Sequence, residues 1–196
     1  VGTGSPPTGV PTVVGQPSGG WVIAWGAQRL GSRDIVLVLV EPDGTVGPEI
    51  IANDVRDRLQ HRPRLAALDD GFVVVWEDRV DRADDPDWGV RARRFTSAGS
   101  PIGGEITVAT NTDVRQGDPA VAAAGNGWVA VWAHWDPFDA ITPSRLFARR
   151  YQEGTATDTE AVELTSDGGF KPSAATLSPG TYAIAWELLR DRETTR

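Results

Sequence analysis

The chain has 196 residues, of which 40% are hydrophobic, and it contains neither cysteine nor methionine. Its formal net charge of −8 excludes the basic stripe that nucleic-acid-binding proteins use to displace counterions. The missing cysteine excludes disulfides and thiolate metal sites. No apolar run approaches the ~18 residues of a membrane-spanning helix, so we expect no membrane insertion.

The first ten residues are rich in Gly, Pro, Ser and Thr, a composition typical of a flexible linker. From residue 11 a repeat begins. Its marks are four tryptophans with separations of 51, 56 and 54 residues: Trp25, Trp76, Trp132 and Trp186. Such a period indicates a propeller, a solenoid or an array.

Each repeat unit begins with a proline 13 or 14 residues before its tryptophan: Pro11, Pro63, Pro119 and Pro172. We therefore divide the repeat region, residues 11–186, into units 11–62, 63–118 and 119–171 and a half unit 172–186. Residues 187–196 form a C-terminal tail.

The order of short runs within a unit predicts its structure. A small, apolar run follows the proline, then a glycine turn and a β-rich run such as Phe72–Trp76. This pattern is typical of a β-hairpin. A third run, such as Val90–Phe95, and a fourth, such as Glu105–Ala109, complete four short strands per unit. Four strands per repeat are typical of a propeller blade, so we predict an all-β, propeller-like fold of about three and a half blades.

The tryptophan strands are apolar on both faces. In the run Phe72–Trp76, residues 72, 74 and 76 face one way and residues 73 and 75 the other, and all five are apolar. A strand that is apolar on both faces is buried on both faces. We therefore expect the four repeat tryptophans to lie between blades, as structural core.

The second unit resembles a repeat found in large secreted bacterial surface and RTX-type proteins. The resemblance is carried by the segments Gly71–Trp76, Gly89–Phe95 and Gly99–Ile106, and the repeat pattern extends over residues 11–186. It implies an extracellular or cell-surface propeller module, and it brings no catalytic residues with it.

An incomplete ring leaves two apolar blade faces open. Monomers seldom expose such large apolar patches. The half unit could close a small four-bladed ring, two chains could join, or the remaining blades could lie on another fragment of the same precursor. We expect association with another copy of the chain or with such a fragment.

Two tryptophans outside the repeat pattern, Trp88 and Trp135, lie in the polar segments that follow the second strand of a unit. Asp87 adjoins the first, and Asp136 and Phe138 follow the second. Aromatic rings beside carboxylates can hold a sugar, and loops on a rigid scaffold often carry function. The alternative is that these rings cap a blade or fill an interface.

The segment from Glu77 to Asp87 contains six carboxylates. A calcium site at Asp84, Asp85 and Asp87 would suit the preference of that ion for several oxygen ligands. A solvated loop, in which aspartates make turns and pair with Arg79 and Arg82, explains the same composition. No other cofactor is indicated.

Histidines and arginines give no catalytic pattern. His61 and His134 occupy different repeat positions, so we expect surface or loop histidines rather than a shared site. The pairs Arg93–Arg94 and Arg149–Arg150 recur at matched positions, which favours a scaffold role over ligand recognition.

Motifs for phosphate loops, nucleophile elbows and zinc proteases are missing. We therefore expect a non-catalytic module for partner binding or assembly. A carbohydrate-binding lectin is the first alternative. A glycosidase-like propeller enzyme, which would need two carboxylates ~5–10 Å apart over a pocket, is the second.

Overall fold

The computed structural model describes residues 7–29, 32–79, 88–109, 115–135, 144–178 and 180–188. Within these ranges every regular element is a β-strand, so they contain no helix that could cross a membrane. The predicted all-β fold is confirmed.

The strands fall into successive groups that we call blades. Blade 1 contains β1 (Pro7–Gly15), β2 (Trp21–Arg29), β3 (Ser32–Val40) and β4 (Ile50–Ile51), and blade 2 contains β5 (Leu59–Leu68), β6 (Gly71–Arg79), β7 (Trp88–Thr96) and β8 (Pro101–Thr107). Blade 3 contains β9 (Arg115–Ala124), β10 (Gly127–Trp135), β11 (Arg145–Gln152), β12 (Thr155–Ala156) and β13 (Val162–Thr165), and half-blade 4 contains β14 (Gly169–Ser178) and β15 (Thr181–Leu188).

Each blade is an antiparallel meander, as the turn pattern predicts. A single parallel bridge between Arg33 and Leu59 links blades 1 and 2. The chain enters regular structure earlier and leaves it later than its composition suggests. Residues 7–10 of the expected linker belong to β1, and Glu187 and Leu188 of the expected tail belong to β15.

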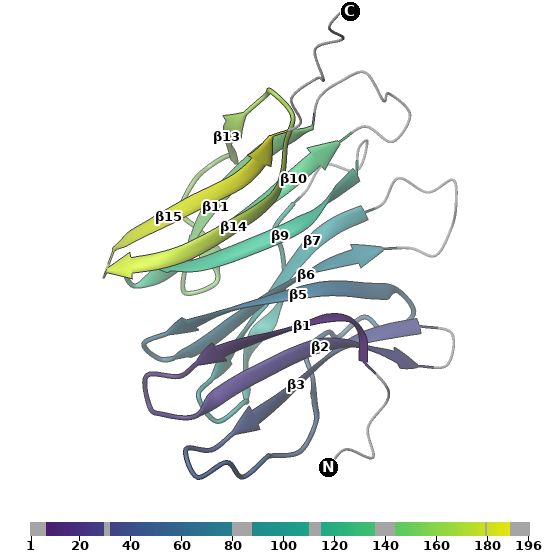
Figure 1. The fold of residues 1–196 in the computed structure, drawn as a ribbon, viewed down its shortest axis with the longest axis vertical. Helices are drawn as coiled ribbons and strands as arrows, with labels where there is room; N and C mark the ends of the chain where they lie inside the picture. The colour runs from purple at the N-terminus through teal and green to yellow at the C-terminus, as the bar shows by residue number, and fades with distance from the viewer. Residues whose placement is uncertain are drawn as a thin grey trace, which may run out of the picture.

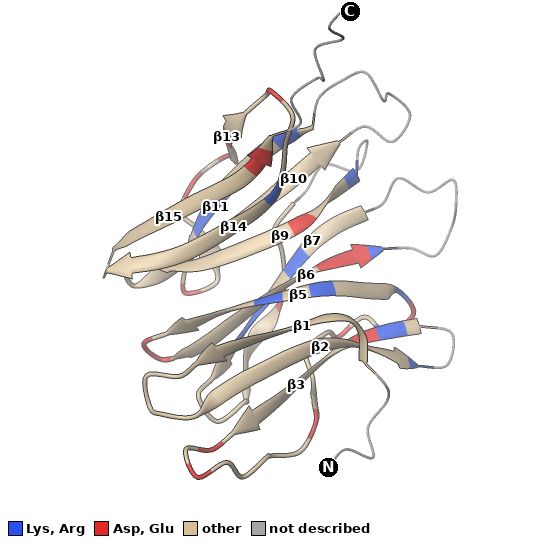
Figure 2. Ribbon diagram, viewed as in Figure 1, with Lys and Arg blue, Asp and Glu red and all other residues tan. Residues whose placement is uncertain are grey.

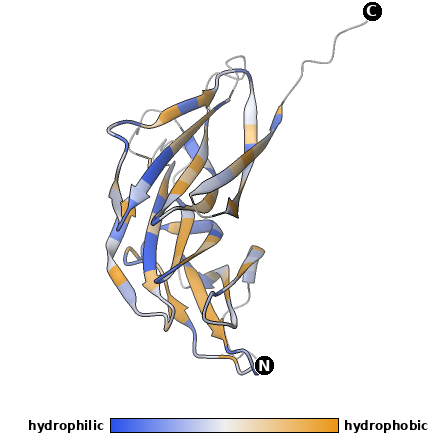
Figure 3. Cartoon of the chain, turned by 90° about the vertical axis from the view of Figure 1, so that its left-hand side faces the viewer, coloured by the Kyte–Doolittle hydropathy of each residue, from blue (hydrophilic) through white to orange (hydrophobic). Residues whose placement is uncertain are grey.

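The blades follow one another in a curved row that we call the fan. Its inner side is formed by the first strand of each blade, which lies next to the first strand of the neighbouring blade: β1, β5, β9 and β14 (Figure 1). The later strands of each blade lie progressively farther out. Seen from the side, hydrophobic and hydrophilic patches alternate along the strands (Figure 3). This arrangement is that of an open, propeller-like fold of about three and a half blades.

Strand β6 is buried on both faces, as its composition predicts. Phe72, Val74 and Trp76 belong to a cluster that includes Val22 and Ile35 of blade 1. Val73 and Val75 belong to another, which includes Trp128, Ala130 and Trp132 of blade 3. The alternation of side chains therefore assigns one face of β6 to each neighbouring blade.

The repeat tryptophans differ in burial according to their place in the fan. Trp76 and Trp132 are buried, and the indole Nε1 of Trp76 donates a hydrogen bond to Gln60 Oε1 at 2.6 Å. Trp25, in blade 1, is half-buried, and Trp186, in half-blade 4, is 38% exposed. The identical sequence position thus contributes most to the core where blades stand on both sides.

The inner strands of three blades share a bulge at the repeat proline. Arg62, Asp118 and Lys171 immediately precede Pro63, Pro119 and Pro172, and their φ angles are 46°, 48° and 45°. The strand register shifts at each of these positions. A non-glycine residue in this left-handed region costs about 1–3 kcal/mol and often marks a functional position. Bulges also re-aim a side chain out of the regular alternation.

Candidate functional site

Charged side chains gather at one end of the inner strands, opposite the hairpin turns. This end is formed by the start of β5 and β9 and the end of β6 and β10. Figure 2 shows the charges toward the right-hand ends of β6 and β9. The bulges described above place Arg62 and Asp118 at this same end.

Arg62, Glu77 and Asp118 form a group that we call the bulge centre. Arg62 Nη1 donates hydrogen bonds to Glu77 Oε1 at 2.9 Å and to Asp118 Oδ1 at 2.6 Å, so these two oxygens lie within about 5.5 Å of each other. The backbone N–H of Asp118 donates to the same Glu77 oxygen at 2.8 Å. The centre thus joins blade 2 to blade 3.

Members of the bulge centre differ sharply in exposure. The Glu77 side chain is 1% exposed, whereas Asp118 and Arg62 are 25% and 54% exposed. Asp118 is therefore the carboxylate that a ligand can reach. Burial alone would lower the pKa of Arg62. The attraction of Glu77 and Asp118 together exceeds this effect, so the pKa of Arg62 is raised and the guanidinium stays charged.

Gly117 allows Trp135 to approach the bulge centre closely. A Cβ atom at this position would lie 2.8 Å from Glu77 Oε1 and 2.9 Å from the Trp135 ring. Real Cβ atoms do not approach other atoms so closely, so any larger residue would push the indole and the carboxylate apart. The missing side chain therefore lets the Trp135 ring lie close to the Glu77 carboxylate.

Trp88 and Trp135, singled out from the sequence, come together at this site. Their ring centroids are 6.0 Å apart in an edge-to-face arrangement. The guanidinium carbons of Arg79 and Arg115 lie 3.9 Å and 4.4 Å from the Trp88 ring centroid. The structure thus adds two cations to the predicted aromatic pair. A sugar-binding role for the pair remains a prediction.

His61 lies in a positively charged environment beside the bulge centre. Its ring nitrogens Nδ1 and Nε2 are 2.6 Å and 3.1 Å from Arg33 Nη1. Burial, with further contributions from Arg79, Arg33 and Arg62, lowers the pKa of His61 to about 3. The imidazole is neutral at physiological pH, and it lies in β5 rather than on the exposed surface expected for it. His134 is buried in β10, where its ring lies 5.2 Å from Phe147, whereas His61 is half-buried.

This shift predicts a pH-dependent stability. Because the folded pKa of about 3 lies below the ordinary histidine pKa of 6.5, the unfolded chain binds the proton more tightly. The contribution of His61 is complete above pH 6.5 and is lost as the pH falls toward 3. Because the ring is only partly buried, we expect a loss of about 1 kcal/mol by roughly pH 5.

The contribution of His61 to the free energy of unfolding can be measured by urea denaturation. The parent chain and His61→Gln are compared at neutral pH and at about pH 5. The variant should lose less stability on acidification than the parent chain, by the same ~1 kcal/mol. Equal losses would contradict the assignment, because the carboxylates that also titrate in this range are common to both proteins.

The recurring arginine pairs serve the scaffold. Arg93 pairs with Asp54 at 2.7 Å, and Arg150 pairs with Asp158 at 2.6 Å. Arg94 contacts Asp70, and Arg149 donates to the Thr159 carbonyl at 2.9 Å. These contacts join neighbouring strands and turns, in agreement with the role favoured by their repetition.

Several predicted site residues lie outside the described residues. They are Asp84, Asp85, Asp87, Asp136 and Phe138. The calcium hypothesis and part of the sugar-binding hypothesis therefore stay predictions. Among the residues that the structure does describe, no group of three or more His, Asp or Glu side chains is arranged to hold a metal ion.

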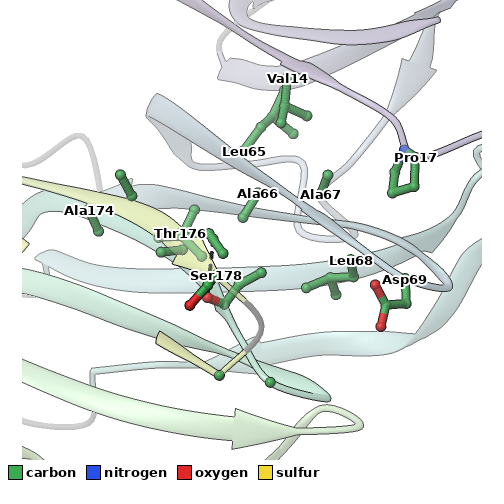
Figure 4. Close-up of a pocket in the computed structure, with 16 residues that line it drawn as sticks. Val14, Pro17, Leu65, Ala66, Ala67, Leu68, Asp69, Ala174, Thr176 and Ser178 are labelled. Atoms are coloured by element: carbon green, nitrogen blue, oxygen red, sulfur yellow. Dashed lines mark hydrogen bonds between the residues drawn. The ribbon is translucent and has the colours of Figure 1, made fainter. Parts of the chain in front are cut away.

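A cavity of about 500 Å³ lies along the inner strands, toward the hairpin turns. Figure 4 shows its walls, which include Val14 of β1, Leu65 and Ala66 of β5, and Ala174 of β14. Leu65 follows Arg62 by three residues on the same strand, so the bulge centre and the cavity share the inner strands. The size falls within the range of small-molecule sites.

The bulge centre does not follow from the motifs considered above, although the sequence carries a signal for it. In three units the residue before the repeat proline is charged, although a buried inner strand would favour an apolar side chain there: Arg62, Asp118 and Lys171. The residue after the repeat tryptophan is an acid in two units, as Glu77 and Glu187. In β14 and β15 the corresponding pair is Lys171 and Glu187, 3.2 Å apart.

No protein-family model and no curated protein sequence matches the chain. Solved structures do share its fold. An alpha-L-arabinofuranosidase variant from Fusarium graminearum, in complex with an iminosugar inhibitor, has a TM-score of 0.62 at 14% identity, with 89% of this chain and 57% of that chain covered.

Two further structures have a similar fold. A thermostable family-43 glycoside hydrolase has a TM-score of 0.56 at 10% identity, covering 90% of this chain and 64% of that one. A Synechocystis apocarotenoid oxygenase has a TM-score of 0.57 at 10% identity, covering 89% and 42%. The chain thus spans less than two thirds of the length of these three structures, and at these identities the likeness concerns the fold.

These comparisons correct one expectation. The motif search led us to expect a module that is not an enzyme, yet the three proteins that share the fold are enzymes, and two of them act on glycosides. That expectation is therefore wrong. It failed because it relied on short contiguous motifs, whereas the charged residues of this fold meet across blades from distant parts of the sequence.

Proposed function

We propose that the chain is part of a carbohydrate-active propeller of the glycoside hydrolase type, acting outside the cell, with its site at the bulge centre. One observation carries the proposal. Asp118, a reachable carboxylate in a left-handed bulge of an inner strand, is held by Arg62 next to a buried second carboxylate and an aromatic pair.

The geometry suits a sugar site in two respects. Asp118 is a partly exposed carboxylate that Arg62 holds beside Glu77, so it can accept from a sugar hydroxyl or act on a glycosidic bond. Across Gly117, the residue before Asp118, the Trp135 ring lies close to Glu77, where it can pack against the apolar face of a sugar. The cavity lies at the other end of the inner strands, and none of the described residues that line it belongs to the bulge centre.

We assign different roles to the two carboxylates. Asp118 is exposed enough to act on a bound sugar or on its attacking water. Glu77 is buried and orients both the Arg62 guanidinium and the Asp118 backbone, so it is a positioning residue. The bulge strain at Asp118 would be retained because it aims this side chain out of the regular strand alternation.

The test is hydrolysis of neutral arabino-oligosaccharides, the sugar class that the Fusarium graminearum structure suggests. Asp118→Asn should lower the rate by ~100-fold or more, because the amide can act neither as a base nor as a nucleophile. Glu187→Gln is the matched control, since Glu187 occupies the Glu77 position of half-blade 4 and is 58% exposed.

Released sugars can be separated and quantified by chromatography, and thermal melting shows that both variants are folded. Equal rates for Asp118→Asn and the parent chain would contradict the assigned role of Asp118. If the parent chain neither binds nor hydrolyses any of these sugars, the proposed function itself is contradicted.

A further inference from the structure

Among the residues that the structure describes, arginines outnumber carboxylates at the bulge centre. Four arginines meet here from four strands: Arg33 of β3, Arg62 of β5, Arg79 of β6 and Arg115 of β9. Among the described residues that these guanidinium groups contact, the carboxylates are Glu77 and Asp118. The local excess stands out because the whole chain has a formal net charge of −8.

Two of these arginines are held in a form suited to ligand recognition. Arg79 and Arg115 both lie over the Trp88 ring. A guanidinium stacked on an aromatic ring keeps its N–H groups in its own plane, directed away from the ring. Within the described residues, Nε of each arginine has no hydrogen-bond acceptor, and Glu77 Oε2 is 3.9 Å from Arg79 Nε.

The surroundings of Arg79 also disfavour its positive charge. The neutral His61 ring adds no charge, and burial lowers the pKa of Arg79, with Glu77 opposing this effect and Arg62, Arg33 and Arg115 adding to it. An incoming anion would relieve the repulsion among the four guanidinium groups. A neutral ligand would leave it in place.

We infer that this site takes a carboxylate-bearing sugar, a uronic acid residue, whose carboxylate pairs with Arg79 and Arg115 while its ring lies beside Trp135. The inference rests on the proposed function and names its substrate class. A planar carboxylate matches the paired N–H groups of a guanidinium, and such bidentate contacts are stronger and more directional than neutral hydrogen bonds. Asp118, the reachable carboxylate, is bonded to Arg62 and lies three residues from Arg115 on β9, so it is available to the rest of the bound sugar.

The experiment compares two ligands that share the same sugar chain: trigalacturonate, whose carboxyl groups are ionised, and its fully methyl-esterified, uncharged form. Isothermal titration calorimetry on the parent chain should show about tenfold tighter binding of the acid, and added salt should weaken binding of the acid alone. This comparison needs no variant, so it stands even if a substitution disturbs folding. Equal affinities for acid and ester would overturn the inference.

Variants then locate the charge that is read. Arg115→Gln should lower affinity for the acid about 5–10-fold and leave the ester unchanged. Arg150→Gln, at an exposed arginine already paired with Asp158, should change neither. An equal loss for both ligands in Arg115→Gln would show a structural role for Arg115 and contradict the inference.

A third arm separates a sugar site from a bare anion site. Acetate at the same concentration should not displace trigalacturonate, and full displacement would contradict recognition of the sugar ring. If the chain hydrolyses neutral arabino-oligosaccharides but binds trigalacturonate no more tightly than its methyl ester, the proposed function stands and this inference is overturned. Failure of every sugar to bind would overturn both.

Discussion

Replacing Trp76 by alanine is expected to lower the free energy of unfolding by about 3–5 kcal/mol. The indole is fully buried between blades 1 and 2, and its Nε1 is bonded to Gln60, itself 1% exposed. The substitution leaves a large cavity and removes the hydrogen-bond donor for the buried Gln60 oxygen. Urea denaturation followed by far-ultraviolet circular dichroism measures the loss.

Trp186→Ala is the matched control, because Trp186 occupies the same repeat position and is 38% exposed. Its substitution should cost about 1 kcal/mol, since less apolar surface leaves water when this strand folds. Equal losses at both positions would contradict the conclusion that burial between two blades, rather than the repeat motif itself, determines the contribution of each tryptophan.

Apolar residues at the two open ends of the fold are exposed because no further blade covers them. We propose that copies of this chain associate through these open ends. Val13 of β1 and Trp21 of β2, both in blade 1, are 61% and 46% exposed. In the internal contacts, tryptophan faces such as Trp128, Ala130 and Trp132 pack on valine faces of the preceding blade. Light scattering should therefore give a molar mass above 21 kDa that falls on Trp21→Ser. A stable monomer would contradict this.

How far the sequence predicts this molecule depends on the range of the interactions concerned. Strands, turns and the two buried faces of β6 follow from alternation and glycine turns, which are local. The pairing of Trp88 with Trp135 and the grouping of Arg62, Glu77 and Asp118 are contacts between residues 15 to 56 positions apart. A contiguous motif cannot show such contacts.

The repeat also carries information about the candidate site, in the residues that precede its prolines. Comparing units at matched positions reveals charged residues before the prolines, where a purely structural repeat would place small or apolar ones. The φ angles of Arg62, Asp118 and Lys171 give the physical reason: the chain leaves the regular strand at this point, so the side chain is redirected. Because such a charge recurs in three of the four units, comparison of matched positions points to the candidate site where contiguous motifs do not.

The second large effect is expected for Arg62→Met. This change removes the charged hydrogen-bond donor of the Glu77 carboxylate, which is 1% exposed. Arg79 remains 3.9 Å from Oε2, and the Asp118 N–H still donates to the oxygen that Arg62 bound. Removing one partner of a buried pair typically costs about 3–5 kcal/mol. Because Arg62 is 54% exposed, water offsets part of this cost, and we expect about 2–3 kcal/mol.

Lys171→Met provides the comparison at the equivalent bulge. Lys171 and Glu187 are 62% and 58% exposed, so their pair contributes less than about 1 kcal/mol. The φ angle of 45° resembles that of Arg62, 46°, so backbone strain is common to both positions. A difference between the two variants therefore reports the ion pair and not the bulge.

The double variant Arg62→Met/Glu77→Gln decides between two explanations of the loss. If the cost arises from an unpaired buried charge, the neutral amide at position 77 should restore most of the stability, because its oxygen still accepts from the Asp118 N–H. If the cost arises from lost packing of the Arg62 stem, the double variant should be no more stable than Arg62→Met. Restored stability without restored sugar hydrolysis would show that blades 2 and 3 can be joined without this charge, whereas the orientation of Asp118 requires it.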